Sequence, residues 1–327
     1  MTALTDLRQQ APTWHRPSMV FAGAMAVMTV VSIGGLIFDD RILIGAPIWL
    51  KPFKFAVSIG LYFVTWAWMT SLLEKGTRLA RYTSNALVVI MAVEYPILVV
   101  QVLRGRASHF NVATPLDTAL YSIMGVSVAG LWICTFVLTA LLVRTPIRDA
   151  ASRWAIRLGG MISLAGMAIG FLMISPTAAQ IRSIKDGTFQ GAAGAHSVGV
   201  EDGGPIMPIT GWSTTGGDLR IPHFVGMHAL QALPLFVLLL TVLATRFPSL
   251  RPDSVRGRLV LLAAAGYAGL VGLVTWQALR GQALVHPDAL TLGALALLVA
   301  LVSLGTLLVV RLTKNHQGEV AEKVGAR

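Results

Sequence analysis

The chain has 327 residues, of which 55% are hydrophobic and 13% are charged, and its formal net charge is +11. Because about 25% of the residues in an average soluble domain are charged, this composition excludes an ordinary soluble fold. The single cysteine, Cys134, excludes an intrachain disulfide and a thiolate metal site. The apolar residues gather into runs of about 20 or more, which is the length of a membrane-spanning helix.

Eight such runs follow one another along the chain, and the first is too long for the core of a signal peptide. We therefore predict an all-α bundle of eight transmembrane helices, with the first run retained as a span. In the fifth span, Gly166 and Gly170 have the small-xxx-small spacing that allows close helix packing. The predicted spans are Ser18–Phe38, Phe53–Leu73, Tyr82–Leu103, Asp117–Val143, Trp154–Ala178, Pro222–Thr245, Arg258–Leu279 and Ala289–Arg311.

The charged residues outside the spans are divided unevenly between the two sides of this bundle. The side that holds both termini carries 17 basic and six acidic residues, and the other side carries nine basic and eight acidic residues. By the positive-inside rule, both termini lie in the cytoplasm of a bacterial-type inner (plasma) membrane. The excess of positive charge is therefore a topology signal, and we expect the lipid bilayer, not a nucleic acid, as the partner.

A short internal repeat suggests a tandem duplication. The end of the third span reads Gln-Val-Leu-Arg-Gly-Arg-Ala at 101–107, and the end of the seventh reads Gln-Ala-Leu-Arg-Gly-Gln-Ala at 277–283. The pairs Asp40-Arg41 and Asp218-Leu219-Arg220 also precede equivalent spans. We predict two four-helix halves, 1–150 and 151–327, related by an axis along the membrane normal. Chance similarity between apolar segments is the alternative.

A 4+4 arrangement with histidines at the outer face resembles the architecture of the haem A synthases. The fourth and eighth spans of this chain carry no histidine. The resemblance is therefore one of architecture.

The polar residues that could form a site gather at the outer ends of the spans. The long outer loop 180–221 has the length of a lid or a binding loop, and a floppy surface loop is the alternative. Its end, with Trp212 and Asp218, is expected to be ordered, and Gly187–Gly204 to be mobile. The predicted cofactor-binding residues are His109, His223, His228, Lys54, Arg104, Arg220, Gln101, Gln231, Gln277 and Arg280.

Two histidines in the sixth span are the predicted metal or haem ligands. A helix turns by about 100° per residue, which places His223 and His228 about 140° apart. They would therefore bind separate partners on a straight helix, or one would hold the other in place. Neutral imidazole is a common ligand of metals and haem iron. For His228, a structural hydrogen bond between helices and a role in proton transfer are the alternatives.

Glu94 is the one acidic residue predicted to lie well inside a span, beside Pro96. An ionisable group at membrane depth indicates function. We expect its carboxyl group to be protonated or paired with Arg104 or Lys54. Glu94 and His228 are the predicted catalytic residues, and a structural ion pair is the alternative for Glu94.

Two classes of function fit these residues. The first is a membrane oxidoreductase or cofactor-processing enzyme with a haem, metal or quinone site near the outer leaflet. The second is a transporter or lipid-binding protein for an anionic or amphipathic small molecule. A scaffold or sensor that acts through the long loop is a weaker third. Because transporters usually bind near the midplane, whereas these polar residues gather at one face, the first class is favoured.

Overall fold

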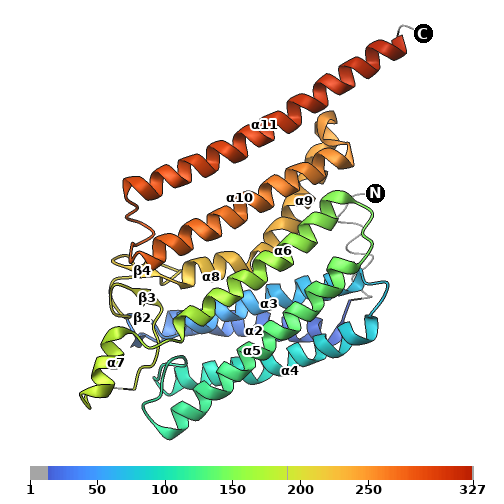
Figure 1. The fold of residues 1–327 in the computed structure, drawn as a ribbon. Coiled ribbons are helices and arrows are strands. Elements are labelled where there is room, and N and C mark those ends of the chain that lie inside the picture. Colours follow the sequence, from blue (N-terminus) through green and yellow to red (C-terminus); the bar gives the residue numbers. More distant parts are fainter. Residues whose placement is uncertain (1–13, 190, 326–327) are drawn as a thin grey trace.

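The computed structural model describes residues 14–189 and 191–325, with side chains as far as residue 311. The chain is a bundle of long helices that lie side by side, as Figure 1 shows, so the predicted all-helical class is confirmed. The α-helices are α2 (Arg16–Phe38), α3 (Leu50–Ser71), α4 (Thr77–Leu103), α5 (Pro115–Arg144), α6 (Ala150–Ile169), α7 (Ala178–Lys185), α8 (Arg220–Met227), α9 (Ala229–Arg246), α10 (Asp253–Leu279) and α11 (Ala289–Gly325). The shorter elements are the 3-10 helices η2 (Gly170–Met173) and η3 (Pro248–Leu250), and two antiparallel hairpins, β1 (Ile42–Leu43) with β2 (Ala46–Pro47) and β3 (Ser197–Val198) with β4 (Gly217–Asp218).

Seven helical segments among the described residues are long and apolar enough to cross a membrane. Each has a length near or above the roughly 20 residues that a hydrocarbon core requires. The chain therefore has the helices of a multi-pass membrane protein. The seven segments are Arg16–Phe38, Thr77–Leu103, Pro115–Arg144, Ala150–Lys185, Ala229–Arg246, Asp253–Leu279 and Ala289–Arg311.

Two of the predicted spans differ from these segments. The predicted span Phe53–Leu73 corresponds to α3, which is a helix of 22 residues but is not among the seven. Its lysines, hydroxyl side chains and tryptophans lower its mean hydropathy. The predicted span Pro222–Thr245 is divided into two helices, α8 and α9, and His228 caps the end of the first and the start of the second.

Local signals explain where several helices begin. The hydroxyl of Thr114 accepts a hydrogen bond from the backbone N–H of Asp117, at 3.1 Å, and caps α5. The carboxylate of Asp149 caps α6 in the same way, through the N–H of Ser152 at 2.6 Å. Such caps satisfy N–H groups that the first turn of a helix leaves without a partner.

The helices form two groups that meet at one interface. In the first group α2 lies along α3, and α4 lies along α5; in the second, α6 contacts α8, α9 and α10, and α11 contacts α10. One core cluster lies mainly in the first group, around Phe63, Trp66 and Leu138, and another lies within the second, around Leu233 and Val260. Contacts of α5 with α6 and of α3 with α9 join the groups.

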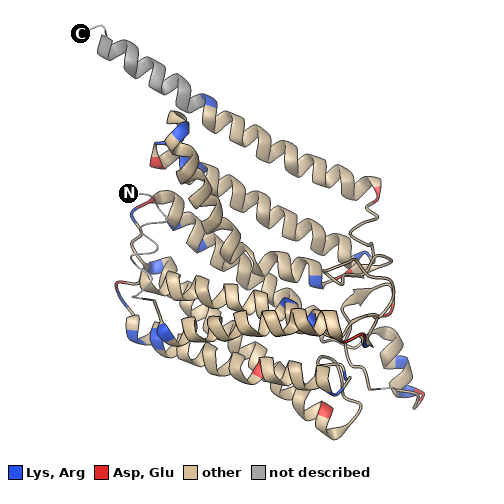
Figure 2. Ribbon diagram, turned by 180° about the vertical axis from the view of Figure 1, so that it is seen from behind, with Lys and Arg blue, Asp and Glu red and all other residues tan. Residues whose placement is uncertain are grey.

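The two ends of the bundle differ. Both hairpins, α7 and the α4–α5 connection lie at one end, which we call the loop end, and the first described residues lie at the opposite end (Figure 1). Charged residues gather at both ends, and the helices between them are almost free of charge, as Figure 2 shows. This distribution is what a hydrocarbon layer around the middle of the bundle requires, because charged side chains are costly there.

Candidate functional site

A cavity of about 1700 Å³ opens from the loop end into the bundle, between the two helix groups. Helices α3, α4 and α5 line it on one side, and α6 and α8 line it on the other. The loop between α7 and α8 lies over its outer part. Along α3 it extends from Lys51 to Tyr62, which is about 16 Å at the rise of an α-helix. This length is about half the thickness of a hydrocarbon core of ~30 Å.

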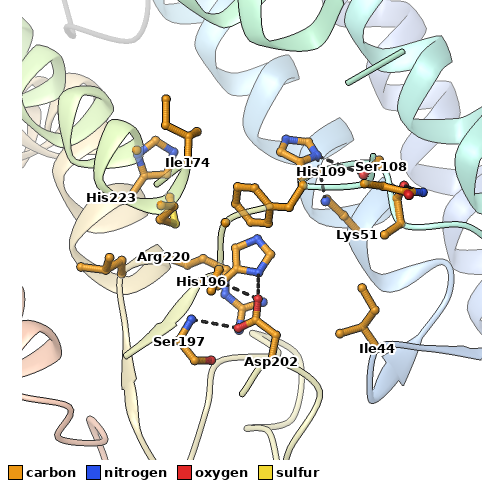
Figure 3. A pocket seen from close by; sticks show the side chains of 18 of the residues that line it. Ile44, Lys51, Ser108, His109, Ile174, His196, Ser197, Asp202, Arg220 and His223 are labelled. Atoms are coloured by element: carbon orange, nitrogen blue, oxygen red, sulfur yellow. Dashed lines mark hydrogen bonds and ion pairs between the residues drawn. The ribbon is translucent and has the colours of Figure 1, made fainter. Parts of the chain in front are cut away.

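Four histidines from four different segments line this cavity. They are His109 in the α4–α5 connection, His196 in the long loop, His223 in α8, and His228 at the junction of α8 and α9. Figure 3 shows the first three around the same space. The structure thus brings together three of the predicted histidines with one that the sequence analysis did not select.

His223 is held by a backbone carbonyl. Its Nδ1 lies 2.8 Å from the carbonyl oxygen of Gly166. A carbonyl oxygen only accepts hydrogen bonds, so Nδ1 carries the hydrogen and Nε2 keeps its lone pair. Gly166 permits this contact because it touches Gly226 of α8 backbone to backbone, and a Cβ atom at Gly166 would meet Gly226 at 2.5 Å. A Cβ atom at Gly170 would likewise meet the His223 ring at 3.0 Å.

His196 is held by a carboxylate. The Oδ2 atom of Asp202 lies 3.0 Å from Nδ1 of His196 and 2.9 Å from its backbone nitrogen, and Oδ1 accepts from Ser197 N–H at 2.8 Å. The ring also meets Phe110 edge to face, with centroids 4.9 Å apart. Burial lowers the pKa of His196, although the hydrogen bond to Asp202 opposes that shift. A neutral ring so placed again leaves Nε2 with its lone pair.

His109 lies beside a lysine. Its Nδ1 lies 3.0 Å from Nζ of Lys51 and 3.0 Å from Oγ of Ser108. When Lys51 is protonated its ammonium group only donates, so Nδ1 then accepts and Nε2 carries the hydrogen. Burial and the nearby positive charge of Lys51 hold the pKa of His109 well below its usual value. The His109 ring is therefore neutral.

His228 has weaker partners. Its Nε2 lies 3.4 Å from Oγ of Ser58, and its Nδ1 lies 3.3 Å from Oε1 of Gln231. All three side chains line the cavity, deeper than His109 and His223. Both distances are at the long end of the range for hydrogen bonds, so the ring is placed but not held tightly.

Positive groups outnumber their partners in this cavity. Nζ of Lys54 donates to the carbonyl of Thr210 at 2.5 Å, and Arg220 is paired with Asp218 at 2.6 Å. Within the described residues, neither Lys51 nor Lys54 has a carboxylate within 4.0 Å. Neither lysine is therefore engaged in an ion pair within the described residues, although the carboxyl groups of Glu201 and Asp202 also line the cavity.

Glu94 also lines the cavity, far from both ends of α4. It is 3% exposed, and its Oε2 has no hydrogen-bond partner among the described residues. The expected ion pair with Arg104 or Lys54 is not formed within the described part of the chain.

Four predicted binding residues lie outside the cavity lining. Gln101 and Arg104 bond to each other, and both donate to Asp117, at 3.0 and 2.8 Å. Gln277 donates to a backbone carbonyl in its own turn, and Arg280 pairs with Asp288 while lying over a tryptophan ring. These side chains hold the turns at the ends of α4 and α10.

His223 and His228 have no shared partner, and no group of three or more His, Cys, Asp or Glu within the described ranges is arranged to hold a metal ion.

The sequence analysis missed the pair of His196 and Asp202. The glycine-rich segment Gly187–Gly204 was expected to be mobile, whereas it contains β3 and this pair. The available signal was the presence of both residue types, six positions apart, in a loop rich in glycine. That spacing has no secondary-structure period, so nothing in it predicts that the two side chains meet.

Comparison of the chain with protein-family models, with curated protein sequences and with solved structures finds no match.

Proposed function

We propose that the chain crosses an inner membrane eight times, with both termini in the cytoplasm. Helix α3 would be the eighth span, since its 22 residues are long enough and it lies along α2. The basic residues at the end opposite the loop end support this orientation by the positive-inside rule. The cavity would then open toward the non-cytoplasmic side.

We further propose that the cavity binds a large amphipathic cofactor with anionic groups, and that haem is the cofactor that the side chains fit best. The observation that carries this proposal is the convergence of His196 and His223 on one cavity, each with Nδ1 occupied by an oxygen. Such contacts are typical of ligand histidines, because they fix the ring and leave Nε2 for the iron. The chain would be a haem-dependent membrane oxidoreductase or a cofactor-processing enzyme.

The unpaired cations support the same assignment. Haem carries two carboxylates on an apolar macrocycle, and Lys51 and Lys54 supply positive groups at the mouth of a mainly apolar cavity. An ammonium group is a good partner for a carboxylate, and both partners gain in a site with little water. A carboxylate-bearing ligand would therefore supply the direct ion-pair partner that these two lysines lack among the described residues.

The same two lysines favour a second candidate function. A transporter or lipid-binding protein for an anionic amphiphile would use Lys51 and Lys54 for the headgroup and the apolar walls for the tail. In that case the histidines would be hydrogen-bonding groups and not iron ligands. The two candidates differ in whether the purified protein absorbs visible light.

The test is an absorption spectrum of the full chain purified in detergent, with and without added haemin. We expect a Soret band that His223→Ala and His196→Ala each shift or abolish. His286→Ala is the matched control, because His286 lies outside the cavity lining, and its spectrum should equal that of the unaltered protein.

A colourless protein that takes up no haemin would reject haem and favour the anionic-amphiphile function. That function would then require that anionic lipids raise the thermal midpoint of the protein, and that the double variant Lys51→Gln, Lys54→Gln lose this response.

A further inference from the structure

The middle of the bundle contains a carboxyl group that forms no ion pair among the described residues. Glu94 lies nine residues before the end of α4 and is almost completely buried. It lines the cavity, and its Oε2 has no hydrogen-bond partner among the described residues. A group placed in this way can be reached from the cavity although it is shielded from bulk water.

Within the described residues no cation lies within 4.0 Å of the Glu94 carboxyl group, although Lys51 acts on it from a greater distance. Helix α2, which also contacts α4, carries a single charged residue, Arg16, at the opposite end of the bundle. The charged and titratable groups that share the cavity with Glu94 come from the helices and from the loops. On the helices they are Lys51, Lys54 and Tyr62 of α3, Tyr121 of α5, Arg220 and His223 of α8, and His228 at the α8–α9 junction; in the loops they are Arg106, His109, His196, Glu201 and Asp202.

Asp117 provides a contrast within the same half. It is 0% exposed, but its oxygens accept from Gln101, Arg104 and Thr114 at 3.0, 2.8 and 2.8 Å. A carboxylate with those partners keeps its charge. A carboxylate without a paired cation or full hydrogen bonding is costly to bury, and the group then takes up a proton instead.

We propose that Glu94 is a protonated carboxylic acid that exchanges its proton through the cavity, so that the cavity is a path for protons from the loop end to the middle of the bundle. Ser58, His228 and Gln231 line the cavity as a hydrogen-bonded group and provide polar atoms along the route. This inference uses the cavity of the proposed function but does not depend on any cofactor in it.

The test uses a hydrophobic carbodiimide on the full chain in detergent, followed by peptide mass spectrometry. A protonated carboxyl group adds across one C=N bond of the reagent. Its proton goes to nitrogen, and its oxygen bonds to the central carbon. The O-acylisourea then rearranges to a stable N-acylurea, so that no atom is lost and the peptide gains the mass of one reagent molecule. We expect this adduct at Glu94, and we expect its rate of formation to fall as the pH rises.

Asp117 is the internal control, because a carboxylate held by Arg104 should stay unlabelled. Infrared spectroscopy provides a second measurement that needs no reagent to enter. The stretching band of a protonated carboxyl group should shift in D2O and disappear in Glu94→Gln, but persist in Asp117→Asn. Equal labelling of both residues, or an infrared band that Glu94→Gln leaves unchanged, would overturn the proposal. A colourless protein with a labelled Glu94 would reject the haem proposal and leave this one standing.

Discussion

The turns that follow α4 and α10 share one hydrogen-bond pattern, but only the first lies against the cavity. In each turn the glutamine side chain donates to the carbonyl six residues later, at 3.3 Å from Gln101 to Ala107 and at 2.9 Å from Gln277 to Ala283. The glycine of each turn has a left-handed φ, of 65° and 71°. The matching sequence therefore accompanies the same helix-end geometry in both turns.

A second pair of turns repeats this lesson with a different depth of burial. The Nε and Nη2 atoms of Arg41 bond to Asp39, and those of Arg220 bond to Asp218, with distances that agree within 0.1 Å. The partner in the first half is thus Asp39, not the Asp40 of the sequence comparison. The Asp218 side chain is 0% exposed and that of Asp39 is 22% exposed, because the long loop covers only the second turn.

The largest expected effect separates these two ion pairs. We expect Asp218→Asn to lower the free energy of unfolding by roughly 3–5 kcal/mol, because it leaves the guanidinium of Arg220 without a charge partner in a largely buried turn. Asp39→Asn should have a small effect, since Arg41 is half-exposed and water replaces the lost partner. The thermal midpoint of each variant in detergent measures the difference. Equal losses would show that the two turns are equally important despite their different burial.

A smaller effect separates the two glutamines. Gln101 is 0% exposed and bonds to Ala107, Arg104 and Asp117, whereas Gln277 makes one side-chain hydrogen bond. We expect Gln101→Leu to cost about 2–3 kcal/mol, because it leaves buried polar partners without a hydrogen bond. Gln277→Leu should cost about 1 kcal/mol, the usual value of a single bond. Chemical denaturation of both variants tests the ratio, and a greater loss for Gln277→Leu would contradict it.

Much of the fold follows from the sequence, because long apolar runs in lipid have few ways to satisfy their backbone groups. The division of the sixth span at His228 does not follow, since no proline or glycine stands at that residue. Helix α3 was predicted as a span but is not among the seven most apolar segments, because it carries two lysines that line the cavity, together with hydroxyl side chains and tryptophans.

The site was predictable in part for a similar reason. His109, His223, His228, Lys54, Arg220, Gln231 and Glu94 line the cavity, as expected of polar residues that lipid would exclude. The four residues outside it were selected by the same reasoning, as polar residues at the outer ends of spans, but in the structure they bond within the turns that follow α4 and α10. His196 was missed because its contact with Asp202 depends on the path of an irregular loop, which the sequence does not predict. The tandem duplication itself stays a prediction.

The smallest expected effect is a local loss of stability in acid. We expect it in the long loop that contains His196, and not in the short connection between α2 and α3. Burial holds the pKa of His196 below its ordinary value of about 6.5, so the folded loop binds fewer protons than the unfolded chain. The contribution of neutral His196 to the stability of the folded loop is therefore complete above about pH 6.5. It is lost as the pH falls through the lower pKa that His196 has in the folded loop. Asp202 does not titrate in this window, because its pKa is also held below the usual range.

Amide hydrogen exchange in the segments 191–219 and 39–49, between about pH 8 and about pH 5, measures this response once intrinsic rates are divided out. Protection should fall with pH in the first segment and stay constant in the second, where Asp39 and Arg41 keep their charges. His196→Gln should flatten the response only in part, because His109 beside the loop also has a pKa well below normal and destabilises the folded state when it is protonated. Equal losses of protection in both segments would mean that acid loosens the whole loop end, and that the pair of His196 and Asp202 does not control it.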